Sequence, residues 1–151
     1  VQVALLTVLA ALDTTAALVA ACLDELVRRP GPRHPGEVVE RVLRTRGPVR
    51  FVRRRATGAH KLGGRTVAEG QPVLAHLRSA HPDDDIGLAF GAGPHACPGA
   101  SIARAVAGGA VAAAAPYQFV RTGEPMLDAS AQIAAYALLP LGLPDIREDQ
   151  L

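Results

Sequence analysis

One cysteine in a glycine-rich segment is the residue of this sequence best suited to chemistry. The segment from Phe90 to Gly99 reads Phe-Gly-Ala-Gly-Pro-His-Ala-Cys-Pro-Gly, with Cys97 near its end. Its glycines allow backbone conformations that a side chain would forbid, and they let a flat cofactor lie close to the backbone. A helix predicted just after Cys97 favours the anionic thiol, because backbone N–H groups at a helix start stabilise negative charge. Such a thiolate is a suitable axial ligand for an iron centre.

An acid–alcohol pair in an apolar helical run is the second candidate. The sequence from Ala10 to Thr15 reads Ala-Ala-Leu-Asp-Thr-Thr, so Asp13 and Thr14 are adjacent. Taken alone, Thr14 would hydrogen-bond within its own helix and Asp13 would occupy a partly exposed helix face.

The cysteine segment resembles the haem-binding signature of the cytochrome P450 family, the haem-thiolate monooxygenases. That signature is Phe-Gly-x-Gly-x-His-x-Cys-x-Gly, followed by apolar residues and Ala-Arg. The resemblance implies that Cys97 ligates the iron of haem b (iron protoporphyrin IX), that Phe90 packs near the sulfur and that His95 reaches a haem propionate. The other positions that match the signature are Gly91, Gly93, Gly99, Ala103 and Arg104, and the first four of them are expected to bind the cofactor. The less favoured alternative is that Cys97 is a small buried hydrophobic residue and His95 a surface residue.

Two further segments resemble parts of the same family. The run from Ala10 to Thr15 is similar to its long central helix, Ala-Gly-x-acid-Thr-Thr, with alanine where glycine is usual. This implies that Thr14 and Asp13 lie over the distal face of the haem and relay protons from solvent. In the run from Arg50 to Thr57, Arg54 has the place of an arginine that binds a propionate, for which a guanidinium is suited by its bidentate geometry.

The sequence also departs from the family pattern. The family places Glu-x-x-Arg in the second predicted helix, but Arg41 stands at the glutamate position and Glu40 lies one residue earlier. Glu40 and Arg44 could pair at i,i+4, and we expect Arg41 to face solvent because an unpaired buried arginine is costly. The segment 79–87 is shorter than the meander that the family has there.

The resemblance covers nearly all of the chain but only the C-terminal part of the family. We therefore expect residues 1–151 to form a single, partial haem-thiolate domain. The N-terminal half of the family fold, including helices that close the substrate pocket, has no counterpart, so it is a candidate partner.

Helices and short strands must position these residues. The pattern predicts helices over 1–29, 36–45 and 100–115, short strands over 49–57, 62–67, 72–77, 117–121 and 131–141, and a loop over 78–87. This is an α+β fold, mainly helical, matching the C-terminal part of the P450 fold: the central long helix, the Glu-x-x-Arg-like helix, small β-hairpins, the cysteine loop and the helix after it. Because residues 1–29 are apolar nearly all round, we expect that helix in the core.

Composition narrows the remaining function classes. With 151 residues, 49% hydrophobic and 3% aromatic, the chain can form one domain with an aliphatic core. A net charge of +2 without long basic runs argues against nucleic acid. Two cysteines make no disulfide framework, which indicates the cytoplasm, and Asp13 in the middle of the first apolar run argues against a membrane span.

The expected function is that of a monooxygenase-type oxidoreductase, and it is the first of three hypotheses. The first is an enzyme that uses dioxygen, a small organic substrate and a ferredoxin-type electron donor. The second is a haem-binding or degenerate protein without monooxygenase activity. The third is a metal-binding module of His95, Cys97, His81 and the aspartates 83–85, which is disfavoured because His-x-Cys lacks the paired ligand spacing of a zinc site.

Overall fold

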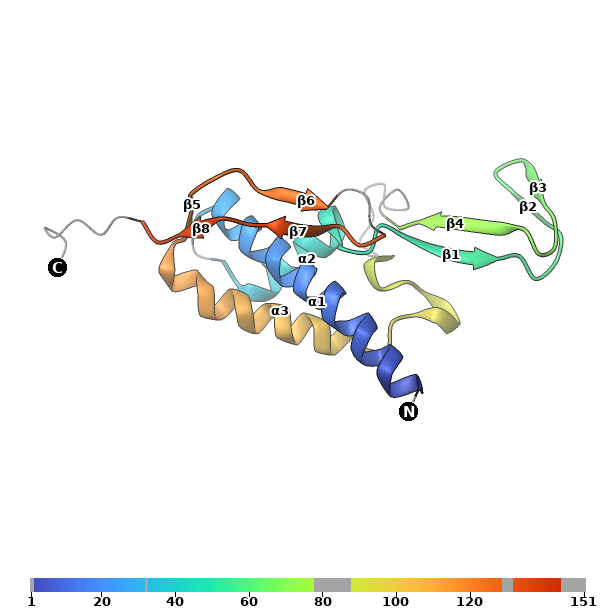
Figure 1. Ribbon diagram of the computed structural model, residues 1–151, viewed down its shortest axis with the longest axis horizontal. Coiled ribbons are helices and arrows are strands. Elements are labelled where there is room, and N and C mark those ends of the chain that lie inside the picture. The colour runs from blue at the N-terminus through green and yellow to red at the C-terminus, as the bar shows by residue number, and fades with distance from the viewer. Residues whose placement is uncertain (1, 32, 78–87, 129–131, 145–151) are drawn as a thin grey trace, which may run out of the picture.

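Among the residues that the structure describes, three α-helices pack together and four short antiparallel strand pairs flank them (Figure 1). The computed structural model describes residues 2–31, 33–77, 88–128 and 132–144. Its helices are α1 (Gln2–Arg28), α2 (Pro35–Arg46) and α3 (Ala100–Ala114), with 3-10 turns η2 (Leu88–Phe90), η3 (Gly93–His95) and η4 (Ala115–Tyr117). Its strands are β1 (Phe51–Arg55), β2 (His60–Leu62), β3 (Arg65–Val67), β4 (Pro72–His76), β5 (Val120–Arg121), β6 (Met126–Asp128), β7 (Ala135–Leu138) and β8 (Leu141–Gly142).

The core lies where the three helices meet, and it is aliphatic as the composition predicts. The C-terminal half of α1 packs against both α2 and α3, and α2 packs against α3. The buried residues of this cluster are Leu18, Ala21, Cys22, Val38, Val39, Val42, Leu43, Ala107 and Val111.

Local sequence explains where α2 begins and ends. The His34 Nδ1 atom accepts the N–H of Gly36 at 3.2 Å, and Pro35 occupies the first turn, where its missing N–H costs nothing. Val38, Val39, Val42 and Leu43 then recur on one face and are buried. At Gly47 a Cβ would lie 3.0 Å from the Leu43 carbonyl oxygen and 3.3 Å from the Ala89 Cβ, so a glycine lets the chain turn close to the segment before the cysteine.

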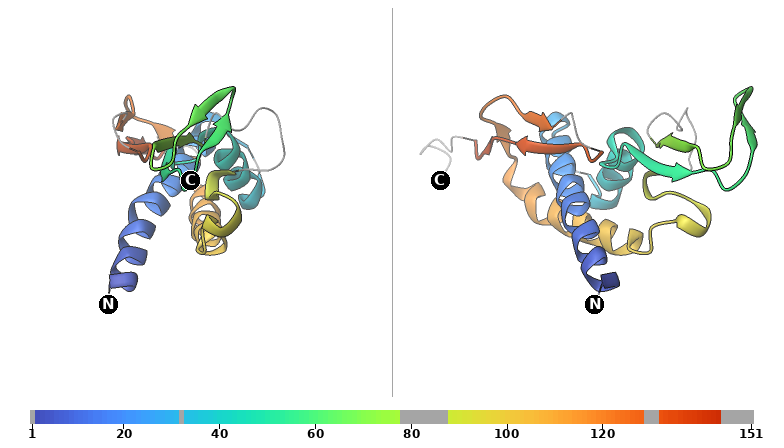
Figure 2. Two further views of the ribbon diagram at one scale, coloured as in Figure 1. Left: turned by 90° about the vertical axis from the view of Figure 1, so that its right-hand side faces the viewer. Right: turned by 45° about the vertical axis from the view of Figure 1, so that its right-hand side comes forward.

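The first helix is only partly in the core, which corrects the prediction that all of it is buried. Leu18 is 1% exposed, whereas Leu12 is 60% exposed. In the left view of Figure 2 the N-terminal half of α1 projects away from the other helices. The side chain of Leu12, on this half of α1, therefore lies mostly outside the core.

The strands form narrow antiparallel ribbons rather than one sheet. β1 pairs with β4, which places Arg54 opposite Val73. β2 pairs with β3 in the segment that connects β1 to β4. β5 pairs with β8 and β6 with β7, and β7 packs on α1. Strands occur in each predicted range, but the range 62–67 holds a turn at Gly63 and Gly64 between β2 and β3, and β6 was not predicted. The predicted loop 78–87 lies outside the described residues.

A buried group of charges joins the C-terminal end of α1 to its surroundings. The Asp24 side chain is fully buried, and its carboxylate accepts hydrogen bonds from the side chains of Arg28, Arg46, Arg121 and Tyr136. Glu25 accepts a hydrogen bond from Arg46 at 2.6 Å. These contacts connect α1, α2, β5 and β7, so the carboxylates are structural groups of the core.

Candidate functional site

The cysteine loop is distant in sequence from α2 and leads directly into α3. It starts at η2 and continues through η3 to Gly99, the residue before α3. The Cys97 N–H donates to the Phe90 carbonyl at 2.8 Å, and the Ala96 N–H donates to the Gly93 carbonyl at 3.0 Å. Figures 1 and 2 show this yellow loop at the end of α3 that faces the ribbon of β1 and β4.

The Cys97 thiol is exposed, and side chains 92–98 are all exposed with it. The thiol is therefore available to a ligand, which excludes the alternative that Cys97 is a small buried hydrophobic residue. The N-terminal end of α3 follows Gly99, and a Cβ at Gly99 would lie 3.9 Å from the Cys97 Sγ atom. Cys97 therefore lies just before the N-terminal end of α3.

Two of the three glycines are required by the backbone. Gly91 has φ +70° and Gly93 has φ +65°, a region that residues with a side chain rarely adopt. Gly99 has φ −94°, so its backbone does not need glycine, contrary to the prediction for all three. At Gly93 a Cβ would meet nothing within 4 Å, which leaves the backbone open at this point of the loop.

Phe90 is tied to the helices on both sides of the loop. Its ring packs against the buried core, as Ala103 does, and the Arg104 guanidinium carbon lies 4.7 Å from the ring centroid. The Arg104 Nε donates to the Glu40 Oε1 at 2.6 Å, which joins α3 to α2. Phe90 thus contacts Cys97 through its carbonyl, and no described contact places its ring on the sulfur.

The acid–alcohol pair lies on the exposed part of α1. Asp13 is exposed and Thr14 is partly exposed, and the Thr14 hydroxyl donates to the Ala10 carbonyl at 2.7 Å. This is the bond within the helix that Thr14 would form without a ligand. Asp13 and Thr14 both belong to α1, which packs on α3, and α3 is the helix that follows Cys97.

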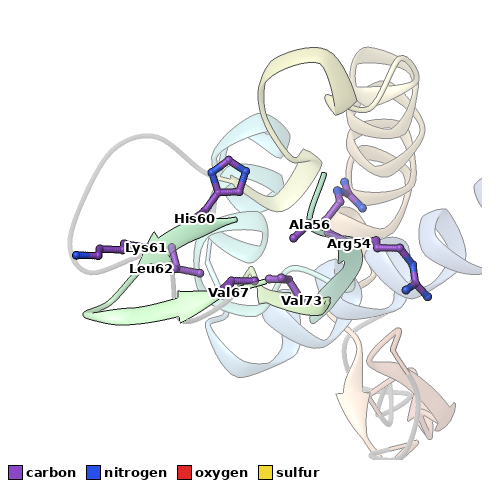
Figure 3. Close-up of a pocket in the computed structure, with 8 residues that line it drawn as sticks. Arg54, Ala56, His60, Lys61, Leu62, Val67 and Val73 are labelled. Atoms are coloured by element: carbon purple, nitrogen blue, oxygen red, sulfur yellow. The ribbon is translucent and has the colours of Figure 1, made fainter. Parts of the chain in front are cut away.

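Arg54 lies on β1, apart from the cysteine loop in its described contacts. It donates to the Arg53 carbonyl at 2.9 Å and lines a hollow of about 260 Å³ with His60, Lys61 and apolar residues. Figure 3 shows His60 and Lys61 on one side of this hollow and Arg54 on the other. His95 ends η3 and is exposed. The two expected propionate ligands therefore come from separate, exposed elements.

The donor set fits a haem better than a bare metal ion. Within the described residues, no group of three or more His, Cys, Asp or Glu side chains is arranged to hold a metal. A haem needs only one protein ligand of this kind, because its macrocycle supplies the other nitrogen ligands. The exposed Cys97 sulfur and the open backbone at Gly93 are compatible with that need. His81 and the aspartates 83–85 of the zinc hypothesis lie outside the described residues.

Sequence reasoning missed the contacts of the second helix. It did not predict that Glu40 contacts Arg104. It placed Arg41 in solvent, but the Arg41 side chain is 40% exposed and its Nε lies 3.9 Å from the Glu25 Oε1. The signal that could have found the contact of Arg41 is the adjacent Asp24-Glu25 at the end of an apolar helix, because buried carboxylates require nearby cations.

None of the described helices combines the length and the hydrophobicity that crossing a bilayer requires.

Comparisons with known proteins bear on the fold of the chain. No family model matches the chain. A protein of Bacillus subtilis named as a cytochrome P450, YjiB, is 32% identical over 115 residues, which are 61% of this chain and 29% of that protein. CYP164A2 of Mycobacterium smegmatis, solved with econazole bound, superposes with a TM-score of 0.75 and 28% identity over 87% of this chain. The cytochrome P450 CYP109B1 of Bacillus subtilis superposes with a TM-score of 0.77 and 23% identity, again over 87% of this chain.

The chain spans less than half of each of these proteins. It covers 39% of the CYP164A2 chain and 43% of the CYP109B1 chain. Its fold is that of the C-terminal part of a cytochrome P450, and its sequence is similar to that part, which confirms the predicted α+β fold class.

Proposed function

We propose, from this likeness to the C-terminal part of cytochromes P450, that the chain is the haem-binding portion of a haem-thiolate monooxygenase. Residues 1–151 would form a single partial domain in which Cys97 is the axial ligand of haem b. The observation that carries the proposal is that Cys97 is exposed in a glycine-rich loop, where its backbone N–H donates to the Phe90 carbonyl at 2.8 Å. When bound, a thiolate-ligated haem supplies the activation of dioxygen.

The roles of the protein side chains follow from their chemistry. Asp13 is exposed and can exchange protons with solvent, and Thr14 beside it can hold a proton on its hydroxyl. We assign them to proton delivery on the distal side, which requires the Thr14 hydroxyl to give up its 2.7 Å bond to the Ala10 carbonyl. Arg54 and His95 would bind the propionates, and Gly91, Gly93, Gly99 and Ala103 would line the cofactor.

The reaction proposed is the insertion of one oxygen atom into a small organic substrate. Its electrons would come from a ferredoxin-type donor in the cytoplasm, where thiols such as Cys22 and Cys97 stay reduced. The chain's own contribution is to bind the cofactor, to orient it through Cys97 and the propionate ligands, and to move protons along Asp13 and Thr14.

We also propose a polypeptide partner equivalent to the remaining part of the relatives. An apolar groove of about 690 Å³ runs along α1 and α3, and its lining includes Leu12, Val19, Ile102 and Val106. Leu12 and Ile102 are 60% and 67% exposed, which is unusual for large apolar side chains that lie together. A helix laid along this groove would bury them, and small residues such as Ala16 in its lining permit close approach.

One observation favours the second hypothesis, a haem-binding protein without monooxygenase activity. Cys97, Asp13 and Arg54 are all exposed, so the described residues do not enclose a dry pocket around them. Productive oxygen transfer needs water to be excluded from the reacting centre. We expect the chain alone to bind haem and to be a poor monooxygenase.

The test is to supply the haem-loaded chain with a generic ferredoxin system and a panel of small organic compounds. Peroxide and hydroxylated product are then measured against electrons consumed. We expect peroxide to account for most of the electrons in the chain alone. Tight coupling of electrons to product without a partner chain would contradict the proposed incompleteness. Electron consumption unchanged by Cys97→Ser, with Cys22→Ala as the control, would contradict the role of the thiolate.

A further inference from the structure

We propose that Glu40 and Arg104 are positioning residues for Cys97, acting through the ring and the carbonyl of Phe90. Arg104 belongs to the matched motif, yet the proposed function gives it no role. Since Cys97 is an iron ligand only under the proposed function, the pair's effect on iron ligation rests on that function. The effect of the Glu40–Arg104 pair on the position of the Cys97 backbone does not rest on that function. An experiment on the haem-free chain can therefore test the positioning separately from the proposed function.

The first link joins α2 to α3. The Arg104 Nε lies 2.6 Å from the Glu40 Oε1, across 64 positions of sequence. The two side chains are 41% and 45% exposed, so solvent screens the pair and its net contribution to stability is small. Its effect is directional, because a hydrogen bond at Nε fixes the orientation of the planar guanidinium.

The second link joins the guanidinium to Phe90. The Arg104 guanidinium carbon lies 4.7 Å from the centroid of the Phe90 ring, within the range of a cation–π contact. The ring packs against the buried core. Core and guanidinium together therefore hold the ring and, with it, the backbone at the end of η2.

The third link joins Phe90 to Cys97. The Phe90 carbonyl accepts the Cys97 N–H at 2.8 Å, so a displacement of Phe90 is passed to the backbone of Cys97. Side chains 92–98 are exposed, and Gly91 and Gly93 leave the backbone between the two residues permissive. Packing of the loop's own side chains contributes little, so the attachment at Phe90 and the start of α3 determine where the sulfur lies.

Amide hydrogen exchange in the full chain without haem tests the inference. Glu40→Gln removes the charge that orients Arg104, and Arg104→Lys keeps a charge but loses the planar fork. The matched control is Glu37→Gln, an acidic residue in the first turn of the same helix. We expect the Cys97 amide to exchange about three- to tenfold faster in Glu40→Gln and Arg104→Lys, from the loss of an exposed ion pair and of a cation–π contact, and to be unchanged in the control.

Two comparisons keep the result interpretable. The amide of Val111, which is buried in α3, reports global opening. In a double-mutant cycle with Phe90→Leu, Glu40→Gln should not further accelerate exchange of the Cys97 amide, because the Glu40–Arg104 pair acts on Cys97 through the Phe90 ring. Equal acceleration at Val111 and Cys97, additive effects in the cycle, or exchange at Cys97 equal to that in Glu37→Gln would each overturn the inference.

The haem-loaded chain supplies a spectroscopic readout. We expect Glu40→Gln and Arg104→Lys to convert part of the reduced carbon-monoxide complex from the red-shifted band of thiolate ligation to the normal band, whereas Glu37→Gln should not. If the exchange at Cys97 rises but the wild-type chain has no thiolate band, the positioning is supported and the proposed function fails. If the bands of all variants match the wild type while the exchange at Cys97 is unchanged, the positioning itself is wrong.

Discussion

The Asp24 Oδ2 atom and the Arg46 guanidinium lie 2.6 Å apart between α1 and α2, and the Asp24 side chain is fully buried. Arg121 and Tyr136 donate to the same carboxylate from the C-terminal strands. The half of α1 that enters the core is therefore attached to three other elements by one side chain. Asp13 and Thr14 lie on the N-terminal half of the same helix. The direction in which α1 extends, and with it the position of these two residues, therefore depends on the contacts of Asp24.

Replacing Asp24 should be strongly destabilising. In Asp24→Asn the partners Arg46 and Arg121 lose their counter-charge, and breaking a buried ion pair from one side costs about 3–5 kcal/mol. Because both arginines are partly exposed, we expect a value near the lower end. Urea unfolding followed by circular dichroism measures it. Asp13→Asn, an exposed change on the same helix, is the control and should shift the midpoint little; equal midpoints for the two variants would refute the role of Asp24.

Stability should fall in acid because of the same carboxylate. Burial alone would raise the pKa of Asp24, but hydrogen bonds from Tyr136, Arg121, Arg46 and Arg28 outweigh it and hold the pKa well below its ordinary value. A lowered pKa in the folded state gives stability that is present above the unfolded pKa of about 3.9 and is lost as pH falls below it. Unfolding free energy measured from pH 6 down to about 2 should decline, and the decline should be shallower in Asp24→Asn. Parallel curves for the two proteins would show that another group is responsible.

The two cysteines should differ sharply in reactivity. Burial raises the pKa of the Cys22 thiol to about 12, with a smaller opposing effect from Arg46, whereas Cys97 is exposed. A thiol reagent at neutral pH should modify Cys97 in the haem-free chain rapidly and Cys22 only on unfolding. Because the folded pKa of Cys22 is raised, its contribution to stability is present below the unfolded pKa of about 8.5 and is lost as pH rises toward 12. Mass spectrometry after timed labelling gives both rates, and equal rates for the two thiols would refute this assignment.

Arg54 and His95 should each strengthen haem retention. A lost charged hydrogen bond to a propionate costs about 1–3 kcal/mol, so Arg54→Ala and His95→Ala should release haem to apomyoglobin faster than the wild type. Arg53→Ala, a neighbouring arginine on the same strand, is the control. Release rates in both variants equal to that of the control would remove these residues from the site.

Local features of the fold could be predicted from the sequence, but distant pairs could not. The apolar repeat in Val38, Val39, Val42 and Leu43 and the glycines at 91 and 93 act through near neighbours, so their consequences are visible in the sequence. Apart from Arg28 on the same helix, the partners of Asp24 lie 22, 97 and 112 positions away, and Arg104, the partner of Glu40, lies 64 positions away. Many arginines are available to each carboxylate, and only tertiary packing selects among them.

The exposure of the site residues has the same origin. An apolar helix was expected in the core, but burial needs a surface to pack against, and the groove beside Leu12 and Ile102 is open in the part of the chain that the structure describes. Side-chain type alone does not reveal whether such a surface is present.

The absorbance spectrum of the reduced, carbon-monoxide-treated chain tests the central claim most directly, because the band position depends on the axial ligand. With haem added, the wild-type chain and Cys22→Ala should both give the red-shifted band of a thiolate-ligated haem, and Cys97→Ser should lose it. A red-shifted band that persists in Cys97→Ser, or a normal band in the wild-type chain, would contradict the assignment of Cys97 as the iron ligand.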